Sequence, residues 1–504
     1  MTATFARRWA DAVAHAGDRP FLVWEGRDGR VATWTYVEFD GVVAEVAGGL
    51  AGRGVKRGAA VHLALANSPA FMATWLAAAR LGAWIVPSDP TSSGPELAGH
   101  VSRTAPVVGL CATDRRGTYA EAASGGPEVV AVDEDDTELA DLRGTPVHAL
   151  DVDEPAPRDP AAVMFTSGTT SAPKGVVVTQ ANYAFAGDVM AAAAGLRAAD
   201  RQLVVLPLFH ANAQYYSFAA AISVAASVAL MPAFSASGFL GQAARHQATH
   251  ASLFAAPMRM ILAKEPVPEP DLRLVHCWYA QNVTGPQYET LAGLLGCRPR
   301  QLYGMTETIP AVLTNRAVGS VPEAMGFPTL GCQVDLRSPD GDDPVADGDT
   351  GEVVVRGEPG VTLFDGYLDD PDATARSFRA GWFRTGDLAR RDGAGRFYFD
   401  GRRSDVLKVA GENVSVVEVE AVLAAHPGVL EAAVIGEPHP MRDEVPVGFV
   451  VQQPGRPPLD ADDLTAWCRD RLAKSKRPVR IEIVPELPRT SVGKIRKFLL
   501  KERA

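Results

Sequence analysis

The chain has 504 residues, more than a single hydrophobic core usually holds, so we expect one large folding unit and at least one further domain. Its formal net charge of -11, from 60 Asp and Glu against 49 Lys and Arg, excludes a strongly basic surface and disfavours nucleic acid as a partner. The five cysteines form no CxxC pair and lie at no metal-ligand spacing from a histidine, which indicates free thiols in a reducing cytoplasm.

The N-terminal half alternates short apolar runs with helical stretches. It opens with MTATFARRWADAVAHAG, which carries charges throughout and lacks an export signal, and which is predicted to form an amphipathic helix. Continuous apolar runs between helical patterns are typical of parallel strands covered on both faces, and hence of an α/β fold. These runs are AVHLALA (60–66), AAVMFT (161–166), QLVVLP (202–207), ASLFAA (251–256) and LRLVHCW (272–278).

Two segments interrupt this alternation. Residues 133–160 are acidic and contain proline, and we expect them to form an exposed connection rather than a core element. Residues 217–234 form the longest apolar stretch, but Ser223 and Ser227 interrupt it and Pro232 ends it before it could span a bilayer. It is therefore predicted to be a buried helix followed by a buried strand.

The character of the sequence changes after Gly341. GEVVVRG and GRFYFDGR are predicted to be antiparallel strands, with Asp392-Gly393 as a turn. A second change follows at Ser404, and we place a domain boundary there. From that point the pattern predicts a strand, a helix over 416–426, strands over 430–436 and 445–452, a helix over 461–474, a strand and a final helix, enough for a small α+β domain.

Residues 165–176, FTSGTTSAPKGV, combine hydroxyls, small residues and a lysine between two apolar strands. Backbone N–H groups, hydroxyl donors and an ammonium on one tight turn suit phosphate oxygens. The segment is not a Walker A loop, because no GK[ST] follows a glycine at the required spacing. The alternative is an ordinary Ser/Thr/Gly hairpin turn.

This segment resembles the phosphate loop of the adenylate-forming superfamily, which comprises the acyl-CoA synthetases, firefly luciferase and the adenylation domains of peptide synthetases. Within it, the segments SGTTSAPKGVVVTQAN, YGMTETI and AGENVSVVEVE are most similar to the crotonobetaine/carnitine-CoA ligases. Further signatures follow in the family's order and cover nearly the whole chain. They are LPLFH (206–210), YGMTET (303–308), GEVVVRG (351–357), GYLDDP (366–371), WFRTGD (382–387), GRRSDVLKVAGENV (401–414) and PRTSVGKIRK (488–497).

The resemblance implies a large N-terminal domain, residues 1–403, built of layered α/β sheets with a barrel-like β subdomain, and a small mobile α+β lid, residues 404–504. It implies a cytoplasmic ATP-dependent acid:CoA ligase that forms an acyl-adenylate and then an acyl-CoA, with release of AMP and pyrophosphate. ATP, Mg²⁺ and coenzyme A are the implied cofactors, a homodimer would fit the family, and no membrane span is expected.

Three alternatives stay open. The enzyme could load a carrier protein instead of coenzyme A, since both thiols share a pantetheine arm. It could be a biosynthetic ligase for a bulky natural-product acid. It could also be a catalytically silent nucleotide-binding relative, against which stands the presence of Glu307, Asp387, Arg402 and Lys494.

The implied nucleotide site must neutralise charge, because a carboxylate attacking the α-phosphate brings two anions together. By resemblance, Glu307 holds Mg²⁺, a hard cation that prefers a carboxylate, and Thr306 contacts the α-phosphate. Tyr303 lies against the adenine, and Asp387 binds the ribose hydroxyls with Arg402 as its companion. A solvated loop acid is the alternative for Glu307, and a surface turn for Asp387 and Arg402. The remaining phosphate contacts are assigned to Thr166, Ser167, Gly168, Thr169, Thr170 and Lys174.

The C-terminal motifs imply two conformations. Lys494 matches the catalytic lysine of adenylation, whose ammonium can bridge the substrate carboxylate and the α-phosphate; a solvated lysine is the alternative. Ser404 falls at the hinge position, where the family usually has Asp or Lys, so the chain departs from the pattern there. Lys408 and Gly411 would face the active site in the second conformation, with Gly411 leaving room for the pantetheine arm.

The acyl pocket is expected to follow the LPLFH motif. His210 matches an aromatic or histidine gate between the ATP and acyl sites, although a core histidine is a rival interpretation. No lone aspartate stands where amino-acid-adenylating enzymes bind the α-amino group, which favours a plain acid as substrate. The family's Gly-Gly-Ala adenine turn is replaced by Tyr-Ala-Gln-Asn at 279–282. Candidate pocket residues, which could equally be core, are Asn212, Gln214, Tyr215, Tyr216, Tyr279 and Met305.

Overall fold

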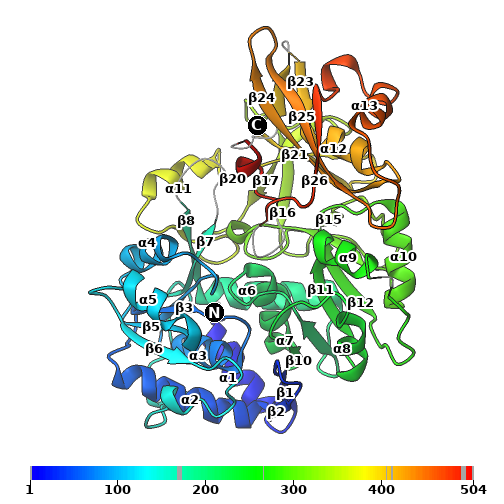
Figure 1. The fold of residues 1–504 in the computed structure, drawn as a ribbon. Coiled ribbons are helices and arrows are strands. Elements are labelled where there is room, and N and C mark those ends of the chain that lie inside the picture. Colours follow the sequence, from blue (N-terminus) through cyan, green and yellow to red (C-terminus); the bar gives the residue numbers. More distant parts are fainter. Residues whose placement is uncertain are drawn as a thin grey trace.

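The computed structural model describes residues 3–166, 173–264, 266–403, 406–409, 412–489 and 495–501. Figure 1 shows the blue-to-green N-terminal half below and the orange and red C-terminal part above it. The chain begins with helix α1 (Phe5–Ala16), whose first turn is capped by Thr4 accepting a hydrogen bond from the Arg7 N–H. The helix buries Phe5, Trp9 and Ala12, as the predicted amphipathic pattern requires.

The first sheet has the strand order β18-β8-β7-β4-β3-β5-β6. Its inner pairs β7·β4, β4·β3, β3·β5 and β5·β6 are parallel, while β8 and β18 add antiparallel edges. The predicted parallel strands are thereby confirmed. The strands are β3 (Ala60–Ala64), β4 (Trp84–Pro87), β5 (Val108–Ala112), β6 (Glu128–Val132), β7 (Pro160–Thr166), β8 (Lys174–Thr179) and β18 (Gly366–Tyr367).

The second sheet has the order β15-β14-β13-β12-β11-β9-β10-β1-β2, parallel from β1 to β13 and antiparallel at both edges. The predicted buried helix and strand within 217–234 are confirmed as α7 and β10. The strands are β1 (Pro20–Glu25), β2 (Val31–Thr35), β9 (Arg201–Val204), β10 (Ser227–Leu230), β11 (His250–Phe254), β12 (His276–Ala280), β13 (Arg300–Tyr303), β14 (Leu313–Thr314) and β15 (Phe327–Pro328).

Helices cover and separate these two sheets. Every residue of α3 is buried, and the main core joins side chains of both sheets around α1, α3 and α6. Phe5 stacks on Trp75 with ring centroids 4.9 Å apart, which ties the N-terminal helix into this core. The helices are α2 (Tyr36–Gly52), α3 (Pro69–Arg80), α4 (Gly94–Thr104), α5 (Arg116–Ala122), α6 (Gln180–Ala194), α7 (Ala219–Val224), α8 (Phe239–Arg245), α9 (Ala255–Leu262) and α10 (Gly285–Leu295).

The connection at 133–160 differs in part from the expectation. Leu139 and Leu142 are buried, and the Glu134 carboxylate accepts a 2.6 Å hydrogen bond from the Ala66 N–H. The chain can pass this close because α2 presents glycine: a Cβ on Gly49 would lie 1.9 Å from the Leu142 carbonyl oxygen. The segment is therefore a connection with a buried middle, which its acidic composition concealed.

A third, antiparallel sheet follows, as predicted. Its strand order is β16-β17-β20-β19. Strand β21 also pairs with β20, on the same side as β19 and further along the strand, and the turn at Asp392 joins β20 to β21. The elements are β16 (Gln333–Arg337), β17 (Thr350–Arg356), α11 (Pro371–Ser377), β19 (Phe378–Arg379), β20 (Trp382–Arg391) and β21 (Phe397–Arg402).

The C-terminal part contains the predicted series of strands and helices and has its own core, which includes Val414, Val419, Leu423, Val434 and Val450. The mixed α/β class, with a large N-terminal and a smaller C-terminal domain, is confirmed. The elements are β22 (Val406–Val409), β23 (Glu412–Ser415), α12 (Val416–Ala424), β24 (Val429–His439), β25 (Asp443–Gln452), α13 (Ala461–Arg469), β26 (Arg480–Val484) and α14 (Lys497–Lys501).

The five cysteines form no disulfide, in agreement with the sequence. Burial raises the pKa of Cys111, Cys297 and Cys468 to about 11 and that of Cys332 to about 12, and it raises the pKa of Cys277 as well. No helix among the described residues is long and apolar enough to cross a membrane.

Candidate active site

The predicted phosphate segment leaves one strand and returns on its neighbour. Thr166 at the end of β7 pairs with Lys174 at the start of β8, so the rest of the segment connects the ends of two neighbouring strands. The Lys174 ammonium lies 4.6 Å from the centre of the Tyr367 ring, a cation–π contact that directs it over β18. Ser167, Gly168, Thr169 and Thr170 lie outside the described residues.

Helix α4 supports the two ends of this loop. His100 stacks on Phe165, the last residue but one of β7, with ring centroids 4.1 Å apart. The Arg103 guanidinium lies 4.8 Å from the same ring and donates to the Pro173 carbonyl. Sequence reasoning missed both residues, because their spacing of three on a helix is common on any helical face.

Three predicted residues from distant motifs meet in one hydrogen-bonded unit. The Tyr303 hydroxyl, at the end of β13, donates to Asp387 Oδ2 over 2.7 Å, and Arg402 Nε lies 2.9 Å from Asp387 Oδ1. Asp387 and Arg402 face each other across β20 and β21. Burial and the neighbouring carboxylate raise the pKa of Tyr303 well above its ordinary value, so its hydroxyl keeps its proton.

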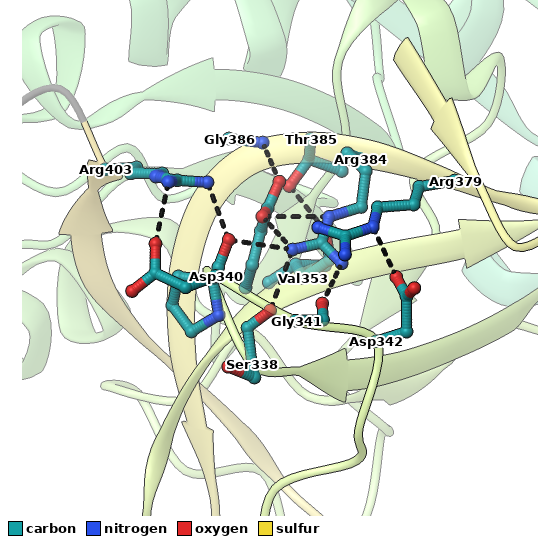
Figure 2. Close-up of polar contacts among 12 residues, drawn as sticks. Ser338, Asp340, Gly341, Asp342, Val353, Arg379, Arg384, Thr385, Gly386 and Arg403 are labelled. Carbon is teal, nitrogen blue, oxygen red and sulfur yellow. Dashed lines mark hydrogen bonds and ion pairs between the residues drawn. The ribbon is translucent and has the colours of Figure 1, made fainter. Parts of the chain in front are cut away.

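A buried ion pair holds the turn that carries Asp387. Glu352 accepts from Arg384 Nε at 2.9 Å and from the Gly386 N–H at 3.0 Å, and its side chain is 4% exposed. Gly386 has a φ of +74°, a conformation that glycine adopts without strain. Figure 2 shows the Arg384 guanidinium also donating to the carbonyls of Ser338 and Gly341. Charged residues in a strand usually lie on the surface, so Glu352 and Arg384 could not be identified as a buried pair from the sequence.

Glu307 lies buried in the short helix Thr306–Thr308 at the end of the YGMTET motif. The Tyr367 hydroxyl donates to its carboxylate over 3.1 Å, and the Lys174 ammonium lies over the other side of that tyrosine. Ile309, immediately after, has a φ of +69°, which is rare for a β-branched residue and costs about 1–3 kcal/mol. Strain of this kind persists where the surrounding structure fixes the backbone, as at binding sites.

The turn at 279–282, which the resemblance predicts to lie at the adenine, is held from the next strand. Gln301 of β13 donates to the Gln281 carbonyl at 3.0 Å and to Asn282 Oδ1 at 2.7 Å. Gln281 and Asn282 are exposed, whereas Tyr279 is fully buried and donates its hydroxyl to the Pro322 carbonyl. The structure therefore places Tyr279 in a second hydrophobic core, which also contains Leu253, Cys277 and Tyr288. It leaves the last two residues of the turn open to a ligand.

The segment after LPLFH forms a π-helix, Asn212–Phe218, a form that is rare and often marks functional sites. Gln214 bonds to Tyr183 and to the Leu208 carbonyl, and the Tyr215 hydroxyl contacts the Met164 sulfur. Asn212 differs, because it is 5% exposed and neither polar atom of its carboxamide has a hydrogen-bond partner among the described residues.

This π-helix lies against the YGMTET motif. A Cβ on Gly304 would come within 2.9 Å of the Tyr216 hydroxyl, so glycine allows the two segments to touch. His210 is half-buried beside the Phe209 ring, and Met305 and Thr306 are half-buried as well. The candidate acyl and nucleotide residues are thus adjacent in space.

The remaining predicted residues lie in the C-terminal segments. Lys494, Ser404 and Gly411 fall outside the described residues, and Lys408 is described only through its backbone, which pairs with Asn413 between β22 and β23. Among the described residues, no group of three or more His, Cys, Asp or Glu side chains could hold a metal ion.

Comparison with known proteins identifies the class. The chain matches the AMP-binding enzyme family over residues 9–368 and the AMP-binding enzyme C-terminal domain over residues 418–494. The crotonobetaine/carnitine-CoA ligase of Salmonella arizonae is 33% identical over 98% of both chains. The fold and these matches define an acid–thiol ligase that forms AMP, an acyl-CoA synthetase. The chain belongs to the AMP-binding enzyme family, and its predicted resemblance to the crotonobetaine/carnitine-CoA ligases is confirmed.

Solved structures agree. ATP-bound MatB from Rhodopseudomonas palustris is 26% identical, with a TM-score of 0.88 over 100% of this chain and 99% of that one. The same protein without ligand, also 26% identical over the same shares, has a TM-score of 0.77. The o-succinylbenzoate-CoA synthetase of Bacillus subtilis with its acyl-adenylate is 26% identical, with a TM-score of 0.85 over 98% of this chain and 97% of that one.

Proposed function

We propose that the chain activates a small carboxylic acid that carries a hydrogen-bonding group, first as the acyl-adenylate and then as the coenzyme A thioester. The observation that supports this most is the unit formed by Tyr303, Asp387 and Arg402, which presents a buried carboxylate next to an aromatic face. A carboxylate can accept from both ribose hydroxyls while the ring packs on the adenine.

The phosphates would lie between Lys174, Thr166 and the loop residues Ser167, Gly168, Thr169 and Thr170, with Thr306 at the α-phosphate. Glu307 fits Mg²⁺, because this ion is usually held by one or two carboxylates and completes its shell with phosphate oxygens and water. When bound, Mg²⁺ would neutralise phosphate charge. Tyr367 would orient the Glu307 carboxylate through its hydrogen bond.

We assign the two half-reactions to two orientations of the small domain, residues 404–504, about a hinge at Ser404. Lys494 would serve adenylation, and Lys408 and Gly411 would serve thioester formation. The TM-score of 0.88 to the ATP-bound MatB, against 0.77 to its ligand-free form, supports an arrangement like that of the nucleotide-bound relative.

The acid would reach the π-helix beside the gate His210, near Met305. The buried Asn212 carboxamide supplies one acceptor and two donors, and leaving these groups unpaired is costly, so a hydroxyl, amide or carboxylate on the acid would be favoured over a hydrocarbon chain. Because the named relatives are CoA ligases, we favour free coenzyme A over a carrier protein as acceptor. We assign the enzyme to the cytoplasm, where ATP and coenzyme A would be available to it.

The test is acid-dependent exchange of labelled pyrophosphate into ATP. A panel of plain aliphatic, hydroxylated, aromatic and quaternary-ammonium acids, including crotonobetaine and carnitine, should give exchange with polar acids ahead of plain ones. Asn212→Leu should lower that preference about tenfold or more, since a site that hydrogen-bonds its substrate rejects analogues lacking the group. Lys494→Ala should abolish exchange yet spare thioester formation from supplied adenylate. No exchange with any acid would overturn the proposal.

A further inference from the structure

The large part of the chain (residues up to 403) and the small part (residues from 406) contact each other beside the proposed hinge, where Ser415 Oγ donates to the Asp400 carbonyl over 3.5 Å, and also at three charged side chains. Arg259 lies on α9, Glu431 on β24 and Arg489 after β26. Arg259 Nε lies 3.3 Å from Glu431 Oε1, and the Arg489 guanidinium pairs with Glu431 Oε2. Of the ion pairs formed between two described residues, Arg259–Glu431 is the one that joins residues before 404 to residues after 405.

This cluster is shielded from solvent. The side chains of Arg259, Glu431 and Arg489 are 20%, 13% and 18% exposed. One carboxylate therefore serves two guanidinium groups in a region of reduced dielectric, where charge interactions are stronger than on an open surface. Burial lowers the pKa of Arg259, the charge of Glu431 offsets part of this, and the charge of Arg489 lowers it as well. Without the carboxylate, the two guanidinium groups would repel.

Each end of the cluster leads to a segment of the proposed nucleotide site. On the large part, Arg259 Nη1 donates to the Asn282 carbonyl over 3.3 Å, in the turn that Gln301 also holds. On the small part, Arg489 forms a backbone bridge with Ile495, and the Arg496 N–H donates to the Pro488 carbonyl over 2.7 Å. These backbone contacts close the base of the segment that contains Lys494 in the sequence.

We propose that Arg259, Glu431 and Arg489 are positioning residues that hold the small part in the orientation used for adenylation. The proposal rests on the proposed function of Lys494 and of the turn at Asn282. Because the cluster must separate when the small part rotates, it favours the first half-reaction and has no role in the second. Arg259 couples this orientation to the turn beside the nucleotide.

The kinetic test separates the half-reactions, using the acid with the fastest pyrophosphate exchange in the panel and its synthetic adenylate. Glu431→Gln should slow exchange about fivefold or more, a typical coupling between two sites, and leave thioester formation from the adenylate within about twofold. Adding Arg259→Gln to Glu431→Gln should lower the exchange rate little further, because the ion pair is already broken. Arg259→Lys, which keeps the charge but loses the planar fork, should retain more exchange than Arg259→Gln.

A matched control is Glu289→Gln, which breaks the exposed pair with Arg298 within the large part and should change neither half-reaction. A distance measurement tests the cluster without any acid. Spin labels at Leu150→Cys and Met441→Cys, both exposed, in a Cys297→Ser/Cys332→Ser background should give a broader and shifted distribution after Glu431→Gln with ATP present.

Equal loss of both half-reactions, or an unchanged distance distribution in Glu431→Gln, would overturn this inference. Absence of exchange in the unmodified enzyme with every acid would instead overturn the proposed function, and the spin-label distances would still decide whether the cluster sets the orientation.

Discussion

Asp387 depends on donors that lie far from it in the sequence. Tyr303 is 84 residues away, at the end of β13 of one sheet, and it reaches the carboxylate at a register shift in β20 of another. The Tyr303 hydroxyl stays protonated at neutral pH, since burial and Asp387 both raise its pKa. It therefore acts as a permanent donor that fixes one carboxylate oxygen, while Arg402 lies beside the other.

Tyr303→Phe should raise the KM for ATP about tenfold, because a hydrogen bond to a charged group contributes roughly 1.5–3 kcal/mol and each 1.36 kcal/mol is a factor of ten. Initial rates of pyrophosphate exchange against ATP concentration measure this. Tyr288→Phe, which removes a hydroxyl bonded to the Pro299 carbonyl in the second core, is the control and should leave KM unchanged. An equal KM in both variants would contradict a positioning role.

At the residue scale, the motifs predicted the members of the candidate site but not the residues that support them. Tyr303, Glu307, Asp387 and Arg402 stand in motifs and could be named from resemblance. Glu352, Arg384, His100 and Arg103 act only through tertiary contacts, and nothing in a single sequence separates a buried ion pair from a surface one.

Strands β3 and β4 and helix α4 are joined by a buried hydrogen-bond chain. His62 bonds through Nδ1 to the Tyr119 hydroxyl at 2.6 Å and through Nε2 to Ser88 Oγ at 2.9 Å, and Ser88 meets His100 Nδ1 at 2.8 Å. Burial lowers the pKa of His62 to about 3 and that of His100 to about 4. Both rings are therefore neutral in the folded protein at neutral pH.

This hydrogen-bond chain should make the free energy of unfolding decrease as the pH is lowered. The unfolded state takes up protons below its histidine pKa of about 6.5 while the folded state does not, so each group's contribution is present above 6.5 and is lost as pH falls toward 4. The slope is about 1.4 kcal/mol per pH unit per group. Urea unfolding between pH 6.5 and 5 should show it. His62→Gln should flatten the slope relative to the exposed control His148→Gln; equal slopes would contradict the argument.

At the element scale, periodicity predicted the parallel strands because both faces of each are covered. It could not predict the π-helix at Asn212–Phe218, because every residue of this segment is buried and the segment therefore has no one-sided apolar period. The two-residue strands β14, β15, β18 and β19 are too short to carry a period at all. The acidic segment 133–160 hid Leu139 and Leu142, whose burial depends on contact with α2.

At the scale of the whole molecule, the N-terminal and C-terminal parts have separate hydrophobic cores. Length and the change of pattern near Ser404 predicted two domains, but their relative placement could not be predicted, because it rests on contacts such as Arg259–Glu431 across 172 residues. Among the residues that the structure describes, the small core, which includes Val419, Leu423 and Val450, contains no side chain of the large part.

Differential scanning calorimetry should therefore resolve two transitions, since each core can melt without the other. The smaller enthalpy should belong to the C-terminal part, because enthalpy scales with the number of residues. Saturating ATP should raise the midpoint of the larger transition by mass action. The unfolding of the entire chain as one unit, with equal calorimetric and van't Hoff enthalpies, would contradict the proposed boundary.

The five cysteines have a practical consequence, since Cys111, Cys277 and Cys468 are buried and Cys297 and Cys332 are half-buried. Their raised pKa values keep the sulfur atoms protonated at neutral pH, and it is the thiolate that reacts. The polypeptide should consequently add little background to a colorimetric sulfhydryl assay, so that disappearance of free coenzyme A could be followed directly in the cuvette. Purified stocks should also tolerate air without a reductant that would compete as an acyl acceptor.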